Sequence, residues 1–273
     1  MNFSLLSFDW SLLGAPLLAG LLVVSTHVLL GRRVLERGII FIDITIAQVA
    51  ALGVIVAGAL GLGDDEGHGA GAQIAAAGAA LLAAALLSWT EKRFRHLQEA
   101  LIGSLYVLAA SVAILVLAHN PHGSEHLQEL LSGQILWVGY SQLWPVAILY
   151  SLILAIWFFW ACERPGAFYY LFAVTVTASV QLVGVYLVFA TLILPAIASW
   201  NLKETRGLLL GYAIGAAGYV LGLWLSVPSD LPAGPLIVTL LAVLALCASA
   251  LWMNLKVMRS ESTDSAQTVE HSD

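Results

Sequence analysis

The stretch Pro165–Leu202 reads PGAFYYLFAVTVTASVQLVGVYLVFATLILPAIASWNL and contains no charged residue. Arg164 precedes it and Lys203 follows it, so a basic residue stands at each of its ends. A helix that crosses the hydrocarbon layer of a membrane needs about 20 apolar residues. The stretch is therefore long enough for two short crossings that turn near Gln181–Gly184, and the number of crossings decides the topology of the chain that follows.

The distribution of basic residues resolves that choice. The eleven lysines and arginines form five clusters, and the loops between them are acidic and contain no Lys or Arg. Cytoplasmic loops of membrane proteins carry an excess of Lys and Arg, which places all the clusters in the cytoplasm. The stretch then begins and ends in the cytoplasm and must cross twice. The clusters are Arg32/Arg33/Arg37, Lys92/Arg93/Arg95, Arg164, Lys203/Arg206 and Lys256/Arg259.

The composition requires a membrane protein. Of 273 residues 60% are hydrophobic and 10% are charged, whereas soluble domains carry about 25% charged residues. We predict an all-α, polytopic membrane protein with about eight or nine transmembrane or partial transmembrane helices, its N-terminus outside and its C-terminus cytoplasmic. The runs of spanning length are Ser11–Leu30, Gly38–Leu60, Ala70–Thr90, Ala100–Ala118, Leu130–Trp160, Pro165–Leu202, Gly207–Ser229 and Leu231–Leu255.

The ends of the chain and the fifth run need separate interpretations. Leu130–Trp160 links an outside loop to an inside one, so it crosses once, with Leu130–Tyr140 as a partial helix before a span that starts at Gln142. No basic residue precedes the first run, so we expect it to remain a helix and not to be cleaved as a signal peptide. Residues 1–258 form the transmembrane domain, and the polar residues 259–273 are predicted to be a disordered cytoplasmic tail.

The sequence lacks the patterns of several function classes. None of its three lysines follows the glycine spacing of a phosphate-binding loop, which excludes nucleotide hydrolysis by that route. No Ser/His/Asp or Cys/His arrangement indicates an intramembrane hydrolase, and the two cysteines do not indicate a disulfide framework. We therefore expect a protein that is not an enzyme, binds no covalent cofactor and has no nucleic-acid partner. The function classes that remain are transport and a scaffold role.

Four segments together carry a resemblance that spans most of the chain. They are GRRVLERGIIFIDITIAQVAALGV (Gly31–Val54), EALIGSLYVLAASVAIL (Glu99–Leu115), QLVGVYLVFATLILPAIA (Gln181–Ala198) and PSDLPAGPLIV (Pro228–Val238). These segments resemble the membrane permease subunit of the zinc/manganese/iron ABC importer family. The most specific match is Val183-Gly184, an aliphatic helix and then Pro195-Ala196.

The resemblance implies a permease subunit of an ATP-binding-cassette importer for a divalent transition metal ion, zinc ahead of manganese or iron, in the bacterial inner membrane. The implied partners are a second copy of the chain, a cytoplasmic ATP-binding subunit, an extracytoplasmic metal-binding protein and membrane lipid. The resemblance also implies that the segment Pro195–Arg206 touches the ATPase. Lys203, Glu204 and Arg206 form a short polar stretch there, and an ordinary charged loop is the alternative interpretation.

The chain departs from the family pattern in two places. The family carries Asp-x-x-x-His before a glycine in its second helix, whereas here Gln48 stands at the His position and Ile44 at the Asp position. Asp43 is one residue out of register, so Asp43 and Gln48 point about 140° apart on a helix, and a carboxamide is a poor zinc ligand. The connection Ala161–Gly166 is also shorter than in the family, which predicts that part of the usual gating apparatus is absent.

Asp43 and Gln48 remain the candidates for a transport pathway. Asp43 is expected about five residues, roughly 8 Å, inside its helix from the cytoplasmic end, and an intramembrane carboxylate is by default a functional candidate. The alternative is an ion pair with Arg33 or Arg37. Gln48 either lines the pathway or hydrogen-bonds a neighbouring helix, because an unpartnered amide is costly in the membrane.

The outside loop His119–His126 is the richest cluster of metal-ligand residues. His122 and His126 are four residues apart and would share a face if this loop were helical, and imidazole with carboxylate suits zinc. A metal-capture site at the mouth would comprise His119, His122, Glu125 and His126, and a solvated loop is the alternative. His27, at the end of the first helix, is interpreted as a satisfied interior histidine.

Two rival functions are compatible with the chain. A secondary carrier for metal ions or small solutes would work without an ATPase and would need buried ionisable residues that relay protons. A membrane anchor or assembly factor would need no polar pathway. Gly211xxxGly215 and Gly218xxxGly222 favour neither function, because this spacing predicts close packing of helices.

Overall fold

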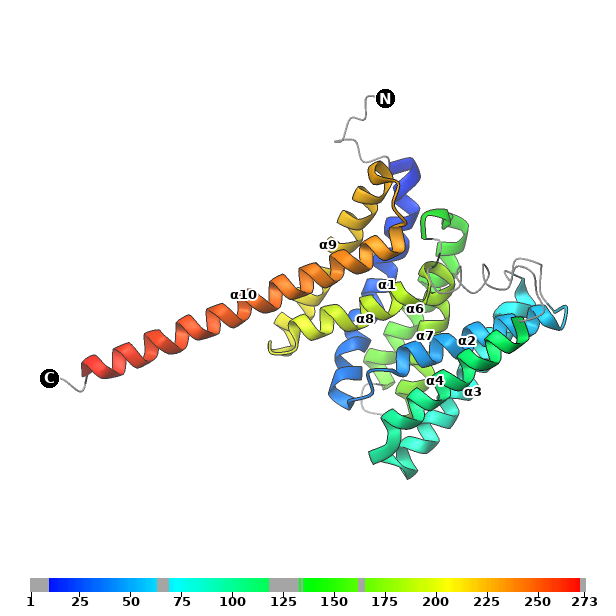
Figure 1. The fold of residues 1–273 in the computed structure, drawn as a ribbon, viewed down its shortest axis with the longest axis horizontal. Coiled ribbons are helices and arrows are strands. Elements are labelled where there is room, and N and C mark those ends of the chain that lie inside the picture. Colours follow the sequence, from blue (N-terminus) through cyan, green and yellow to red (C-terminus); the bar gives the residue numbers. More distant parts are fainter. Residues whose placement is uncertain (1–9, 63–68, 118–132, 134, 162–164, 271–273) are drawn as a thin grey trace.

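The computed structural model describes residues 10–62, 69–117, 133, 135–161 and 165–270, and these residues contain helices and no strand (Figure 1). Eight helical segments of this described part are long and apolar enough to cross a membrane, and Val185–Ser199 is a shorter apolar helix. The predicted all-α architecture is confirmed. The helices are α1 (Trp10–Arg37), α2 (Ile42–Ala59), α3 (Ala70–Arg93), α4 (Gln98–Leu117), α6 (Tyr140–Ile156), α7 (Pro165–Val183), α8 (Val185–Ser199), α9 (Glu204–Ser229) and α10 (Ala233–Glu270).

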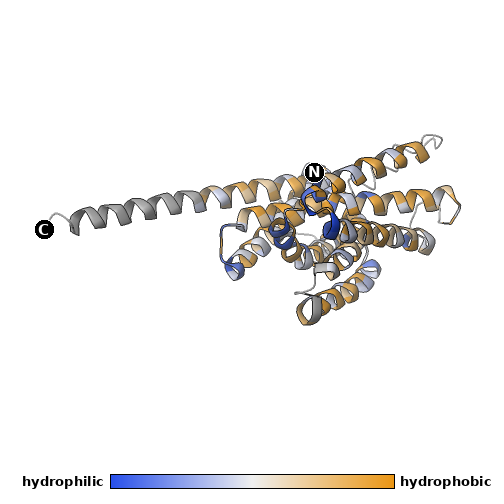
Figure 2. Cartoon of the chain, turned by 90° about the horizontal axis from the view of Figure 1, so that it is seen from below, coloured by the Kyte–Doolittle hydropathy of each residue, from blue (hydrophilic) through white to orange (hydrophobic). Residues whose placement is uncertain are grey.

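The helices form two groups joined by α7. α2, α3 and α4 pack on one another, and α1, α8, α9 and α10 form the second group (Figure 1). α7 contacts members of both groups, and α6 lies against α1 and α7. In the most apolar part of α1 72% of the residues are buried inside the protein, whereas in the most apolar part of the α4 span 17% are buried. The hydrophobic residues along the outer helices (Figure 2) therefore face lipid or another chain and not a protein core.

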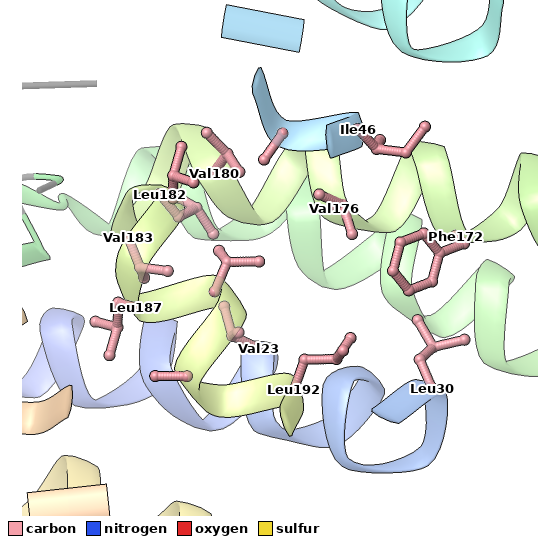
Figure 3. Packing of buried hydrophobic residues seen from close by; sticks show 14 of the residues in the cluster. Val23, Leu30, Ile46, Phe172, Val176, Val180, Leu182, Val183, Leu187 and Leu192 are labelled. Carbon is pink, nitrogen blue, oxygen red and sulfur yellow. The ribbon is translucent and has the colours of Figure 1, made fainter. Parts of the chain in front are cut away.

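A hairpin of α7 and α8 accounts for the uncharged stretch Pro165–Leu202. α7 ends at Val183 and α8 begins at Val185, where the chain turns back at an angle to α7, and Val176 and Leu187 are directed into a shared apolar core (Figure 3). Gly184 makes the turn with φ 81° and ψ 164°, a conformation that is essentially restricted to glycine. The turn predicted near Gln181–Gly184 is confirmed.

Both ends of this hairpin lie at the end of the bundle that carries the basic clusters. Near the start of α7, a Cβ on Gly166 would lie 3.8 Å from Ser88 Oγ, which is close to the basic end of α3. At the end of α8, Arg32 of α1 donates a hydrogen bond to the Ser199 carbonyl. The hairpin therefore begins and ends on one side, as the distribution of Lys and Arg predicts. Which side of the membrane this is stays a prediction.

The hairpin turn gives a first testable expectation. We expect Gly184→Ala to destabilise the protein by about 1 to 3 kcal/mol, because a Cβ is strained at this φ and ψ. Gly139→Ala is the matched control, since Gly139 has an ordinary φ of −95° and its Cβ would meet no atom closer than 3.7 Å. The measurement is the thermal melting temperature of the purified protein in detergent. Equal melting temperatures for the two variants would contradict the role assigned to Gly184.

Two boundaries differ from the sequence-based expectation. The partial helix before the fifth span is the short 3-10 helix η2 (Ile135–Trp137), and α6 begins at Tyr140, two residues before the predicted start at Gln142. α10 continues to Glu270, so residues 259–270 are helical in the structure, where the sequence predicts disorder. A helix that is already nucleated inside the bundle gains one backbone hydrogen bond for each added residue, which favours its continuation.

The glycines of α9 pack the bundle, as their spacing predicts. A Cβ at Gly211 would lie 2.7 Å from Val28 Cγ1, and one at Gly215 would lie 2.9 Å from Val24 Cγ1 of α1. Gly218 and Gly222 instead face α10, where a Cβ would overlap its side chains. The small residues thus let α9 approach α1 on one face and α10 on another.

Candidate functional site

Asp43 is a buried carboxylate without a hydrogen-bond partner. Its side chain is fully buried, and neither carboxylate oxygen is hydrogen-bonded. The expectation that Asp43 lies about five residues inside its helix is wrong, because the turn Gly38–Phe41 separates α1 from α2 and places Asp43 in the first turn of α2. A carboxylate there is favoured by the positive end of the helix dipole. Such a group in a membrane helix marks a functional site by default.

The arginines near Asp43 in the sequence have other carboxylate partners. Arg33 Nη1 lies 2.8 Å from Glu36 Oε2, and Arg37 Nη1 lies 3.6 Å from Glu91 Oε1. The Arg37 guanidinium also lies 4.4 Å from the centre of the Phe168 ring. These contacts join the C-terminal end of α1 to α3 and α7, and they give no support to the alternative of a structural ion pair for Asp43.

Gln48 is buried on another face of the same helix. It is 3% exposed, and its amide makes no hydrogen bond to another residue of the described part. Asp43 and Gln48 point in directions about 140° apart, yet both are buried because α2 has neighbours on several sides, among them α3, α4, α7 and α8. The structure does not bring the two side chains onto one face of α2.

His27 is a second buried ionisable group. Its Nδ1 lies 2.9 Å from the Val23 carbonyl oxygen, so Nδ1 carries the proton and donates it. Nε2 is then an acceptor, and it has no hydrogen-bond partner. The sequence-based interpretation of a satisfied interior histidine therefore holds for one ring nitrogen and not for the other.

The segment Pro195–Arg206, named here the coupling segment, lies at the basic end of the bundle between α8 and α9. Pro195 is buried within α8, where the Ser199 hydroxyl donates a hydrogen bond to the Pro195 carbonyl at 2.8 Å. From Trp200 onward the side chains turn outward, and Lys203, Glu204 and Arg206 are all exposed. The segment thus presents charged side chains on a short turn between two packed helices, a geometry suited to contact with another protein.

Arg32 holds the coupling segment against α1. Its side chain is 8% exposed, and Nη1 donates a hydrogen bond of 3.1 Å to the Ser199 carbonyl. Nη2 donates a longer one, 3.5 Å, to the Leu202 carbonyl. In the sequence Arg32 is one of the basic residues that orient the chain, and it indicates no other role, because nothing in the sequence indicates a contact between positions 167 residues apart.

Clusters of metal ligands are absent from the described residues. Within that part of the chain no group of three or more His, Cys, Asp and Glu side chains is placed to hold a metal ion. The predicted mouth site, His119, His122, Glu125 and His126, lies outside the described residues and stays a prediction.

Comparison with known proteins relates both sequence and fold to transporters. The model of the ABC 3 transport family matches residues 10–163 and 165–252. Comparison with curated protein sequences gives no match. The fold is similar to that of PsaBC from Streptococcus pneumoniae, solved in complex with a Fab, with a TM-score of 0.70 and 22% sequence identity over 92% of this chain and 96% of that one.

A second solved structure shares the fold. It is an inward-facing conformation of a putative metal-chelate type ABC transporter, with a TM-score of 0.60 and 15% identity over 90% of this chain and 85% of the other. The family match extends over nearly all the spans, and the described residues have the apolar helices that such a protein needs. The chain therefore belongs to the ABC 3 transport family, as a multi-pass permease of the bacterial inner membrane.

Proposed function

We propose that this chain is the permease subunit of an importer for a divalent transition metal ion, with zinc ahead of manganese or iron, and that it works as a homodimer. A cytoplasmic ATPase and an extracytoplasmic metal-binding protein complete the transporter. Nucleotide binding would close the ATPase subunits, move the coupling segment and switch the opening between the transmembrane helices. The chain itself would carry out no hydrolysis.

The observation that carries this proposal is the coupling segment. Membership of an ABC transport family means that the energy comes from a separate nucleotide-binding subunit, since the sequence has no phosphate-binding loop of its own. That subunit needs a contact on the cytoplasmic face. Lys203, Glu204 and Arg206 supply exposed charged groups there, directly after the packed helix that contains Pro195.

The choice of a metal ion rests on the family resemblance and on the chemistry of the buried groups. One similar structure is described as a putative metal-chelate type ABC transporter. In this chain the Asp43 carboxylate and the His27 imidazole are buried in the bundle with ligand atoms that have no hydrogen-bond partner, and the Gln48 side chain is also buried. Carboxylate and imidazole are ligands for zinc, manganese and iron. Zinc is placed first because it favours imidazole, which the loop His119–His126 also supplies.

Copurification tests the assignment. The chain, extracted in mild detergent from cells that make the whole transporter, is expected to retain a cytoplasmic ATP-binding subunit, and deletion of its gene is expected to lower cellular zinc, manganese or iron. A chain that never retains an ATPase, together with normal metal uptake in the deletion strain, would contradict the proposal.

Charge reversal in the coupling segment sharpens that test. We expect Lys203→Glu combined with Arg206→Glu to lower the amount of copurified ATPase by about tenfold, because exposed rim charges steer and orient a protein contact. Lys92→Glu combined with Arg93→Glu makes the same charge change at exposed positions at the end of α3 and is expected to leave the ATPase bound. Quantification of both subunits in the eluate gives the ratio, and equal losses in both double variants would contradict a specific role of the coupling segment.

The secondary carrier remains a second candidate, because within the described residues His27 joins Asp43 as a buried ionisable group with an unpartnered atom, where the sequence indicated Asp43 alone. A carrier would accumulate its substrate from a proton or sodium gradient in liposomes that contain this chain alone. The importer predicts no accumulation under those conditions.

A further inference from the structure

Arg32 lies where the last turn of α8, the coupling segment and α9 meet α1. The final carbonyls of a helix have no partner within the helix. The Arg32 guanidinium reaches across from α1 and donates hydrogen bonds to the Ser199 carbonyl, at the end of α8, and to the Leu202 carbonyl, in the turn that follows. Arg32 thus caps α8 with a side chain from another helix.

Two features of this contact strengthen it, although Arg32 Nε is buried without a hydrogen-bond partner. Arg remains charged in proteins and presents several N–H donors in a rigid, planar arrangement. A cation at the C-terminal end of a helix also interacts favourably with the helix dipole. Arg32 is 8% exposed, so water competes little for these hydrogen bonds. The neighbouring ion pair, by contrast, joins Arg33 Nη2 and Glu204 Oε1 over 3.9 Å, and the Glu204 side chain is 71% exposed. Exposed ion pairs of this kind contribute little to stability.

A glycine on α9 makes room for the guanidinium. Gly207 is buried in the first turn of α9, and a Cβ built there would overlap Arg32 Nη1. The same Cβ would lie 3.1 Å from the Ser199 carbonyl oxygen, which is the acceptor of the Arg32 hydrogen bond. The absence of a side chain at position 207 therefore permits the contact between Arg32 and the coupling segment.

The end of α1 also holds the other half of the bundle. Arg37 lies beyond Arg32 on α1, and it contacts Glu91 of α3 and the Phe168 ring of α7. α1 thus connects the coupling segment, through Arg32, with the α2–α4 group and α7, through Arg37. A displacement of the coupling segment has a continuous set of contacts through which to reach the helix that carries Asp43.

We propose that Arg32 is a positioning residue of the transport cycle: it fastens the coupling segment to α1, so that a movement imposed on the coupling segment from the cytoplasm is carried into the transmembrane helices. This inference rests on the proposed function, and it assigns to Arg32 a role in coupling, not in binding the metal or the ATPase. Loss of the contact separates ATP hydrolysis from transport.

The experiment measures transport for each ATP hydrolysed. The complex of the chain with its ATPase is reconstituted in liposomes and supplied with the extracytoplasmic metal-binding protein. Uptake of Zn²⁺, with Mn²⁺ and Fe²⁺ as alternatives, is divided by the rate of ATP hydrolysis. We expect Arg32→Gln to keep hydrolysing ATP while this ratio falls by about tenfold, and Arg32→Lys, which keeps the charge but not the planar donors, to recover part of it. Arg95→Gln removes the same charge from an exposed position on the same side and is expected to keep the original ratio.

Gly207→Ala tests the same contact without changing any charge. Alanine favours a helix, so the variant is expected to fold, while its Cβ displaces the guanidinium from the Ser199 carbonyl. We expect the ratio of metal uptake to ATP hydrolysis to fall as in Arg32→Gln. The double variant, Arg32→Gln with Gly207→Ala, is expected to have a ratio no lower than that of the more impaired single variant, because both changes remove the same interaction. Gly103→Ala, where a Cβ meets nothing within 4 Å, is the control and is expected to behave like the unaltered chain.

The outcomes separate this inference from the proposed function. An unaltered complex that shows no ATP-driven metal uptake would overturn the proposed function and the inference with it. If the unaltered complex transports metal and the Gly207→Ala or Arg32→Gln variant keeps the original ratio of uptake to ATP hydrolysis, the inference alone is overturned. Additive losses in the double variant would also overturn it, since they would show that Arg32 and Gly207 act independently.

Discussion

Gly31→Val is expected to abolish the folded protein. Gly31 lies in α1 where this helix crosses α8, and a Cβ at this position would overlap the backbone carbonyl oxygen of Leu192. Backbone cannot swing aside as a side chain does, so the two helices would have to separate, at a cost of about 3 kcal/mol or more. Leu30 of α1 and Leu192 of α8 point into the core shown in Figure 3, so this separation would expose much of it.

Gly103→Val provides the control for that prediction. Gly103 lies in α4, also an apolar helix, and a Cβ there would meet nothing within 4 Å. The variant is expected to elute as a single symmetric peak in size-exclusion chromatography, whereas Gly31→Val is expected to elute as aggregate. Folded Gly31→Val with an unchanged melting temperature would show that α1 and α8 are not in contact at this point.

Asp43→Asn is expected to lower transport by about tenfold to a hundredfold while the melting temperature stays equal or rises. The loss of transport follows if the carboxylate contacts the passing metal ion, since an amide is a much weaker ligand for such ions. The melting temperature is not expected to fall, because the Asp43 side chain makes no hydrogen bond that its replacement by asparagine would remove. A loss of transport without a loss of stability distinguishes a pathway residue from a structural one.

Asp230→Asn is the matched control for Asp43→Asn. Asp230 lies in the turn between α9 and α10 with a φ of 55°, which asparagine also tolerates, and its side chain is exposed. Neither uptake nor melting temperature is expected to change. A fall in the melting temperature of Asp43→Asn, with transport lowered only in proportion to the folded protein, would assign Asp43 to packing.

Sequence alone predicted the architecture of this protein because membrane insertion obeys simple rules. The positions of Arg164 and Lys203 required two crossings between them, and the structure places the turn at Gly184. The apolar runs also predicted the apolar helices that the described residues form, since a span in lipid must satisfy every backbone polar group within the helix. Boundaries were less accurate: the start of α2 at Ile42, and not near Gly38, moved Asp43 to the first turn.

The contacts of the site were beyond the reach of sequence. Arg32, Arg33 and Arg37 look alike in a sequence and all indicate the cytoplasmic side, yet Arg32 caps α8, Arg33 pairs with Glu36 and Arg37 pairs with Glu91. These roles depend on which helices meet, and tertiary packing decides that. The charges of Lys203, Glu204 and Arg206 could be placed at the cytoplasmic surface from their positions alone, and the structure confirms their exposure.

The most direct test of the central claim, that this chain moves a metal ion with energy from a partner ATPase, is metal accumulation in sealed liposomes. Liposomes that contain the chain and its ATPase, supplied with the extracytoplasmic metal-binding protein, are expected to accumulate Zn²⁺, Mn²⁺ or Fe²⁺ only when ATP is present on the ATPase side. An ATP analogue that is not hydrolysed is expected to stop repeated turnover. Accumulation driven by an ion gradient in liposomes that contain the chain alone, and unaffected by ATP, would contradict the account.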